Sequence, residues 1–467
     1  MSTSDAGVSD AAHVPGALQS AYPVRAGNFV RPLVDGEPAF RRICEAVEAA
    51  RHSVWVTVAF LEHDVQMPDG RGTFFDVLDR AAARGLDVRA LFWREPRFDE
   101  VEPDSSHFGG SDEERAWLSG RGSRLLARWD RLPDSFCQHQ KSWIVDAGER
   151  SEVAFVGGIN LDAESVSAPG HAPRQTRHVH DVYVEVRGPA ATDVHHNFVQ
   201  RWNEASERGD PGGAWPDAGA AGDLAFPAFP SRTAGEVPVQ ITRTIMLERY
   251  SDETPTPGGK PFPVFGGETS VLEQYLAAIA AARSSLYFEN QAIGSPIVVD
   301  AIRAALDRGV EVVFLVPGNA HPAFVEARRD PRAVFFFDKL AGLGGYESFT
   351  LAAIAGSLDE ERYDEVYVHA KILLVDDAWA TIGSTNVAER SFHSDTELNA
   401  SVWHAPTVRT LRVALLREHL ARDTSPLDDR AALRLYREIA LANRDRRVDL
   451  KPLAGLAYQL DPRDYGA

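Results

Sequence analysis

A short pattern of charged and polar residues occurs twice in the chain, and this repetition limits the folds that the chain can adopt. Each copy has a histidine, a lysine two positions later and an aspartate five positions after the lysine. The two sets are His139, Lys141 and Asp146 in the first copy and His369, Lys371 and Asp376 in the second. A repeat of this kind predicts two structurally equivalent units.

Both copies lie in apolar runs typical of buried strands, Q-H-Q-K-S-W-I-V-D and V-H-A-K-I-L-L-V-D. Successive side chains of a strand alternate between its faces, so the histidine and the lysine share one face and the aspartate does not. A solvent-exposed pair at a sheet edge would explain one copy. Two copies favour a functional site, in which an anion compensates the buried cationic groups.

The similarity extends to both sides of the pattern. Residues 49–56 and 80–92 resemble residues 281–288 and 303–315, so each half is expected to run helix, strand, helix, strand and then motif strand. Small residues and an asparagine follow each motif: Gly157, Gly158 and Asn160 in the first half, and Gly383, Ser384 and Asn386 in the second. Further on, Asp181 and Glu397 stand at the starts of alternating strands.

The domain organisation follows from composition. We expect a disordered N-terminal arm over residues 1–22, an N-terminal half over residues 23–205 and a Gly/Pro/Ala-rich linker over residues 206–238. The C-terminal half spans residues 239–467 and ends in helices with apolar residues at three- and four-residue spacing.

Composition restricts partners and location. The formal net charge is −19, so a nucleic-acid partner is not expected. Neither a signal peptide nor a membrane-spanning run is evident, which predicts a cytoplasmic protein that could associate peripherally with the membrane. The two cysteines indicate neither a disulfide framework nor a zinc site. Cys137 could form a thiol–histidine pair with His139, but Tyr367 stands at the matching position of the second copy, which favours an incidental residue.

The doubled H-x-K-x4-D pattern, each copy followed by G-G/S-x-N, resembles the HKD motifs of the phospholipase D superfamily. The stretches E-N-Q at 289–291, H-D-V at 180–182 and N-F-V-Q-R-W at 197–202 resemble its phospholipid-acting branch, although Ala292 replaces the aromatic residue usual after E-N-Q. The resemblance implies an α/β fold: two similar halves with central mixed β-sheets flanked by helices, a pseudo-twofold axis with one active site, and additional C-terminal helices.

The residues themselves suggest a chemistry for phosphodiesters. One histidine can attack phosphorus while the other, protonated, donates to the leaving alcohol. Lys141 and Lys371 would hold the phosphoryl oxygens without a metal ion, and no cofactor is expected. The asparagines Asn160 and Asn386 are equally well explained as further donors or as turn residues.

The acidic residues are expected to act on the histidines or on the backbone. Asp181 and Glu397 would accept the Nδ1 proton of a histidine, and the resemblance implies that each serves the opposite half. It also implies that His139 is the nucleophile. Asp146 and Asp376 face away from the lysines and are expected to hold the strand end structurally.

We therefore expect a phospholipase D-type enzyme that cleaves the terminal phosphodiester bond of phospholipids through a phosphohistidine, with transfer to alcohols. The substrate would be a phospholipid at a membrane surface or in micelles, the acceptor water or an alcohol, and the protein a monomer. A nuclease or general phosphodiesterase of the superfamily, or a non-catalytic scaffold, are the alternatives. Residues 98–110 and 341–350 are expected to line the pocket, and the pair His195–His196 to lie on the surface.

Overall fold

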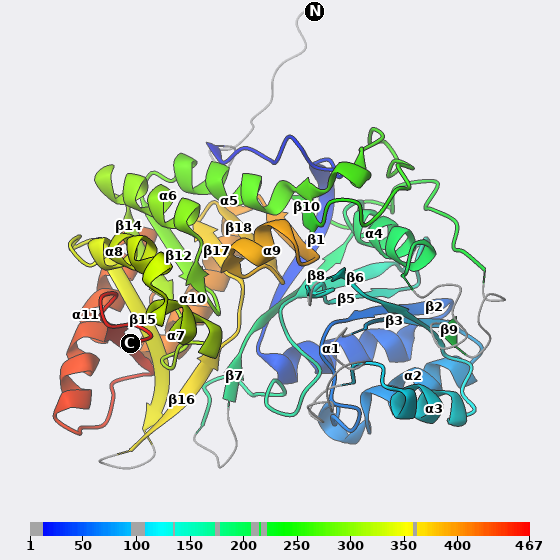
Figure 1. Cartoon of the computed structure of the whole chain (residues 1–467), viewed down its shortest axis with the longest axis horizontal. Helices are drawn as coiled ribbons and strands as arrows, with labels where there is room; N and C mark the ends of the chain where they lie inside the picture. Colours follow the sequence, from blue (N-terminus) through cyan, green and yellow to red (C-terminus); the bar gives the residue numbers. More distant parts are fainter. Residues whose placement is uncertain are drawn as a thin grey trace, which may run out of the picture.

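The sequence repeat corresponds to a repeated strand order within one continuous sheet (Figure 1). The computed structural model describes residues 13–94, 108–133, 136–172, 178–206, 214–215, 222–357 and 362–467. The strands of the first half are β1 (Arg25–Val34), β2 (Ser53–Val58), β3 (Asp87–Trp93), β4 (Leu126–Asp130), β5 (Ser142–Val145), β6 (Val153–Gly157), β7 (His178–His180), β8 (Val182–Arg187) and β9 (Ala214–Trp215).

The second half continues the same sheet. Its strands are β10 (Val237–Ile245), β11 (Glu268–Thr269), β12 (Ser285–Glu289), β14 (Glu311–Leu315), β15 (Phe349–Ser357), β16 (Tyr363–Val368), β17 (Ile372–Val375), β18 (Trp379–Gly383), β20 (Glu397–Val402) and β21 (Ala457–Leu460), and the separate pair is β13 (Ile293–Gly294) with β19 (Val387–Ala388).

The two halves have matching strand neighbours. The pairings run β4-β3-β2-β5-β6-β8-β1 in the first half and β15-β14-β12-β17-β18-β20-β10 in the second. In each half the first three strands are parallel and the others antiparallel. Parallel neighbours need crossover connections, which explains the helix between consecutive parallel strands.

Helices cover the sheet in both halves (Figure 1). They are α1 (Gly36–Ala49), α2 (Phe74–Ala83), α3 (Asp112–Gly120), α4 (Ala191–Asn203), α5 (Ser270–Ala281), α6 (Pro296–Asp307), α7 (Pro322–Arg329), α8 (Val334–Leu343), α9 (Glu389–His393), α10 (Ala405–Leu420) and α11 (Asp429–Val448). The predicted α/β class and the two C-terminal helices, α10 and α11, are thus confirmed. No helix of the described residues is long and apolar enough to span a bilayer.

Three backbone pairings join the halves and position the motif segments. Strand β1 pairs with both β8 and β10, which makes the sheet continuous. Strand β7 pairs in parallel with β16, and His180 lies opposite Val368 in this pairing. An isolated β-bridge joins Gln138 to Thr396. Because His180 precedes Asp181 and Thr396 precedes Glu397, each acidic residue is carried to the motif of the other half.

The N-terminal arm departs from expectation. Residues 13–22 were expected to be disordered, but they lie against the second half, with Val14 and Tyr22 buried. The backbone N–H of Ala17 donates to the side-chain oxygens of Gln240 and Gln274, at 2.9 and 2.8 Å. These buried hydrogen bonds order the segment, and only residues 1–12 of the arm lie outside the described part of the chain.

Candidate active site

His139 is held beside a carboxylate of the second half. Its backbone N–H donates to the carbonyl of Thr396 at 3.1 Å, which places it next to Glu397. The imidazole Nδ1 lies 3.0 Å from both Oε1 and Oε2 of Glu397, and the histidine is 6% exposed. This contact orients the ring and leaves Nε2 available for chemistry.

His369 is held in the equivalent way by a carboxylate of the first half. Its backbone N–H donates to the carbonyl of His180 at 2.8 Å, and its Nδ1 lies 2.6 Å from Oδ2 of Asp181. Both carboxylates therefore contact the histidine of the opposite half, in the geometry that the resemblance implied.

The two lysines lie in the same buried cluster. The Nζ of Lys141 donates to the carbonyl of His139 at 2.9 Å, and Lys371 donates to the carbonyl of His369. Burial lowers the pKa of Lys141, and it lowers the pKa of Lys371 to about 7. A phosphodiester anion bound here would favour the charged form of both ammonium groups.

Burial acts on the carboxyls in the opposite sense. It raises the pKa of Asp181 to about 7 and that of Glu397 to about 8, while the nearby lysines lower both. Burial also lowers the pKa of His139, and the positive charges of Lys141 and Lys371 add to this effect. Because Lys371 of the second half acts on His139 of the first, the two motifs form one electrostatic site.

The small residues after each motif allow this close approach. A Cβ on Gly158 would lie 2.5 Å from Oδ1 of Asp181 and 3.0 Å from Cδ of Lys371. Gly157 is as confined, because a Cβ there would be 2.4 Å from the carbonyl of Val182.

The second half differs at one of these two positions. A Cβ on Gly383 would lie 2.1 Å from Oδ1 of Asn399, so a glycine is required there too. Ser384, which corresponds to Gly158, has space for a side chain and donates its hydroxyl to Oε2 of Glu397. The Oδ1 atoms of Asn160 and Asn386 are buried without a hydrogen-bond partner, so each can accept a hydrogen bond from a ligand hydroxyl or N–H group.

The motif aspartates accept hydrogen bonds from the backbone. Asp146 Oδ1 accepts the N–H groups of Arg51, His52 and Ser53, at 2.8, 2.7 and 3.3 Å. In the same way Asp376 accepts three N–H groups, each at 2.8 Å, from Arg283, Ser284 and Ser285. Both aspartates have positive φ, at the turn after the motif strand.

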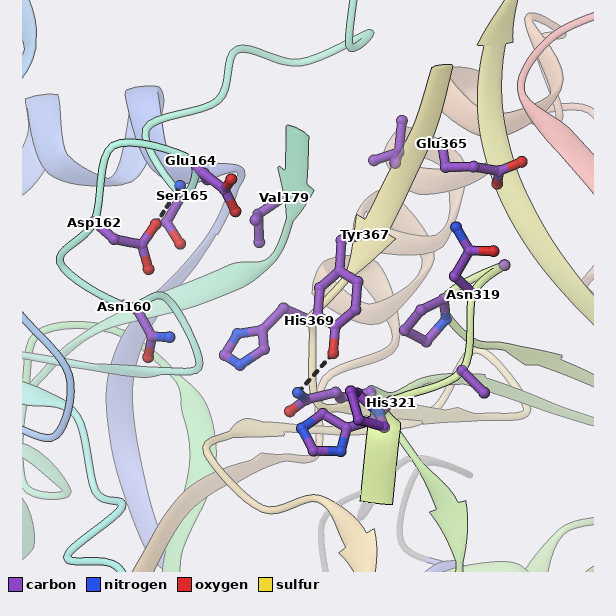
Figure 2. A pocket seen from close by; sticks show the side chains of 16 residues that line it. Asn160, Asp162, Glu164, Ser165, Val179, Asn319, His321, Glu365, Tyr367 and His369 are labelled. Carbon is purple, nitrogen blue, oxygen red and sulfur yellow. Dashed lines mark hydrogen bonds between the residues drawn. The ribbon is translucent and has the colours of Figure 1, made fainter. Parts of the chain in front are cut away.

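A pocket of about 590 Å³ leads to this cluster from one side (Figure 2). His369 and Asn160 line it, whereas His139 does not. Three carboxylates, Asp162, Glu164 and Glu365, also line the pocket, and its described lining contains no lysine or arginine. Residues 341–350, expected at the pocket, are absent from this lining; they run from the end of α8 through a turn to the start of β15. The other expected loop, 98–110, lies mostly outside the described residues.

An aromatic residue accompanies each histidine, and the sequence reasoning missed both in this role. The ring centroid of Phe60 lies 5.9 Å from that of His139 and 5.6 Å from Nζ of Lys141. Tyr367 stacks on His369, with 6.4 Å between centroids, and its hydroxyl accepts from Gln291 at 2.8 Å (Figure 2). Tyr367 could have been inferred, because strand alternation places it on the face of His369.

Three other polar residues are buried, with different consequences. Cys137 is buried, and burial raises its pKa well above the usual value, which disfavours a thiolate nucleophile. His195 and His196, expected on the surface, are 5% and 3% exposed. They are satisfied by internal hydrogen bonds, His195 Nδ1 with Glu152 at 3.0 Å and His196 Nε2 with the carbonyl of Thr254 at 2.8 Å.

The chain is similar in sequence to cardiolipin synthases and to a plant phospholipase D. The family model described as the PLD-like domain of cardiolipin synthase matches residues 275–418. Cardiolipin synthase A of Pseudomonas entomophila is 28% identical over 384 residues, which cover 80% of this chain and 65% of that protein. Phospholipase D alpha 2 of Oryza sativa subsp. japonica is 24% identical over 513 residues, covering 81% and 61%. The chain thus spans slightly less than two thirds of the length of these relatives.

A solved structure supports the fold. The phosphatidylserine synthase of Haemophilus influenzae Rd KW20 superposes with a TM-score of 0.56, covering 92% of this chain and 97% of that one. The sequence identity is 12%, so the similarity concerns the fold.

Proposed function

The chain belongs to the phospholipase D superfamily, and from this premise we propose that it transfers the phosphatidyl group of a phospholipid to water or to an alcohol. The observation that carries the proposal is the pair of histidine–carboxylate contacts across the halves, His139 with Glu397 and His369 with Asp181. Two lysines in the same buried cluster supply positive charge for the phosphoryl oxygens.

In the first step Nε2 of His139 attacks phosphorus. The bond from phosphorus to the head-group oxygen breaks as the phosphorus–nitrogen bond forms, and His369 gives its proton to the leaving oxygen. In the second step His369 removes a proton from the incoming water or alcohol, whose oxygen replaces His139 on phosphorus. The residue that exchanges protons with alcohols should adjoin the space that alcohols occupy, and His369 lines the pocket while His139 does not.

The charge of the pocket favours a particular head group. Asp162 and Glu164 line it, and a cationic amino alcohol such as choline or ethanolamine would complement their carboxylates. Glu365, also in the lining, is already paired with Arg447 at 2.7 Å. The same charges, with the net charge of −19, would repel the neighbouring phosphates of a nucleic-acid strand, which disfavours the nuclease alternative.

A second candidate is the synthesis of cardiolipin from two molecules of phosphatidylglycerol. The match of residues 275–418 to the PLD-like domain of cardiolipin synthase favours it. The chemistry is the same, with the glycerol hydroxyl of a second lipid as acceptor. The two candidates differ in the charge of the preferred lipid.

One assay tests both candidates. The purified chain is incubated separately with vesicles containing phosphatidylcholine, phosphatidylethanolamine or phosphatidylglycerol, with and without 1-butanol, and the lipids are analysed by mass spectrometry. We expect phosphatidylbutanol to form at the expense of phosphatidic acid, most readily from the two lipids with cationic amino groups. Formation of cardiolipin from phosphatidylglycerol, with no reaction of the other two lipids, would establish the second candidate. If the chain cleaves the soluble diester bis-p-nitrophenyl phosphate in a separate incubation but leaves every lipid intact, both candidates are refuted.

A further inference from the structure

A second cluster of titratable side chains adjoins the candidate active site, because it contains His180, the residue before Asp181. Two histidines and two carboxylates from four separate segments meet there: Asp35 before α1, His171 in a loop, His180 at the end of β7 and Glu418 on α10. The side chains of Asp35, His171 and His180 are completely buried, and that of Glu418 is 9% exposed. None of the four takes part in the proposed phosphoryl transfer.

Three of the four distances within this cluster match those of a metal-ligand set. His171 Nε2 lies 3.4 Å from Asp35 Oδ1, 3.4 Å from His180 Nδ1 and 3.3 Å from Glu418 Oε1. His180 Nδ1 lies 2.9 Å from Asp35 Oδ1, and all four atoms fall within 4.8 Å of one another. Ligands at about 2.0–2.2 Å from a tetrahedral zinc ion are separated by about 3.3–3.6 Å, which agrees with three of these four separations.

The outer contacts also resemble those of a metal-bound histidine. His180 Nε2 donates to Oε2 of Glu289 at 3.0 Å, and the hydroxyl of Tyr287 donates to the other oxygen of Glu289 at 2.6 Å. A histidine that binds a metal through one nitrogen usually donates its other N–H to a carboxylate, which fixes the tautomer. With an ion bound in place of the Nδ1 proton, this contact would leave the lone pair of His180 Nδ1 for the ion.

Two polar atoms of the cluster are unsatisfied. Asp35 Oδ2 and His171 Nδ1 are buried and have no hydrogen-bond partner. Asp35 immediately precedes α1, yet its side chain does not cap the helix, and its Oδ1 is directed to the two histidines instead. Buried polar atoms are rarely left unpaired without a functional reason.

We propose that Asp35, His171, His180 and Glu418 bind one divalent transition-metal ion, for which zinc is the best match. Two imidazoles and two carboxylates supply four ligands of the nitrogen and oxygen types that zinc binds, and their two negative charges balance the ion. The candidate is separate from the phosphoryl-transfer chemistry, for which the lysines supply the positive charge.

The consequence for the enzyme would be positional. The carbonyl of His180 accepts the backbone N–H groups of His369 and Ala370, at 2.8 and 3.1 Å, and His180 is followed by Asp181. An ion bound to His180 and Glu418 would tie β7 of the first half to α10 of the second. It would thereby stabilise the alignment of His369 with Asp181.

The test is metal content, followed by spectroscopy. The chain is produced in zinc-supplemented medium, dialysed against metal-free buffer and analysed by mass spectrometry for metals. We expect about one zinc ion per chain. After replacement by cobalt(II), a visible absorption band of tetrahedral coordination should appear, and zinc should displace it.

Two variants assign the ion to this cluster. His171→Ala and the isosteric Glu418→Gln should retain less than about a tenth of the metal and lack the cobalt band, because each removes one of four ligands. His195→Ala is the matched control, since His195 is also buried and paired with a carboxylate, and it should keep both signals. Circular dichroism verifies folding.

Two results would overturn the proposal. Metal-free wild-type protein that shows no cobalt band would mean that protons alone hold the cluster, with the histidines donating to Asp35 and Glu418. Equal metal content in wild type, His171→Ala and Glu418→Gln would place the ion elsewhere.

Discussion

His139 and His369 occupy equivalent positions in the two halves, but their carboxylates are held differently. Glu397 presents both oxygens to His139 at 3.0 Å and also accepts the hydroxyl of Ser384. Asp181 presents one oxygen to His369 at 2.6 Å, while its other oxygen accepts the N–H of Val182 at 2.7 Å.

The surroundings of the two histidines differ as well. Phe60 lies edge-on to His139, which does not line the pocket, whereas His369 stacks with Tyr367 and lines it. The repeated backbone provides two similar histidines, and the side chains around them provide the asymmetry that the proposed roles of nucleophile and acid would require. Each of the following predictions tests this comparison.

The largest effect is expected from the histidines. His139→Ala and His369→Ala should each lower kcat for a phospholipid by about 10³-fold or more, because nucleophile and acid act as a unit. Bis-p-nitrophenyl phosphate separates their roles, since p-nitrophenolate leaves without protonation. His369→Ala should still release a burst of about one equivalent of nitrophenol by forming the covalent intermediate, and His139→Ala should not. A burst from His139→Ala alone would reverse the assignment.

A smaller loss should follow from changing the residue beside each carboxylate. Gly158→Ala would displace Asp181 or Lys371, since the new Cβ would lie 2.5 Å from Oδ1 of Asp181, and a shift of this size should lower kcat by about 100-fold. Ser384→Ala removes one hydrogen bond to Glu397 and should lower kcat by about 10-fold. Steady-state kinetics with a soluble diester measures both. Equal effects would contradict the asymmetry between the two halves.

The carboxyl of Glu397 should make stability depend on pH. Burial raises its pKa to about 8, so the folded chain holds a proton that the unfolded chain releases near its ordinary pKa of 4.5. This contribution to stability is complete below pH 4.5 and is lost as the pH rises through 8. Between pH 5 and 7, Tm should therefore fall more in the wild type than in Glu397→Gln. The lowered pKa of His139 adds the opposite trend below its ordinary value of 6.5 in both proteins, and that of Lys371, about 7, adds it above pH 7. Parallel Tm curves for the two proteins would contradict the raised pKa.

The smallest effect on catalysis is expected from the motif aspartates. Asp146→Ala and Asp376→Ala each remove an acceptor of three backbone N–H groups and should lower the free energy of unfolding by about 1–3 kcal/mol. The two losses should be similar, because each aspartate also has one side-chain partner: Asp146 accepts the hydroxyl of Ser151 at 2.7 Å, and Asp376 contacts His13 Nε2 at 2.9 Å. Chemical denaturation measures the loss.

The asparagine variants are the matched controls. Asp146→Asn and Asp376→Asn keep an acceptor oxygen and tolerate positive φ, so they should be less destabilised than the alanine variants. If these variants lost as much kcat as the histidine variants do, a purely structural role of the aspartates would be contradicted.

Much of the fold could be predicted because its signals are local. The repeat and the helix–strand alternation predicted two matching halves, and strand alternation separated Asp146 and Asp376 from the lysines. The buried positions of His195 and His196 could not be predicted, because their partners Glu152 and Thr254 come from other elements. Likewise, nothing in residues 13–22 indicates that Gln240 and Gln274 accept the N–H of Ala17.

The sequence by itself determined the composition of the site: two histidines, two lysines and two acids, in two equal sets. Only the tertiary structure decided that β7 pairs with β16 and Gln138 with Thr396, which brings each acid to the opposite histidine. It also decided that Asp35, His171, His180 and Glu418 converge. The physical reason is that residue spacing encodes the face of a strand or helix, whereas contacts between distant segments depend on how the completed elements pack.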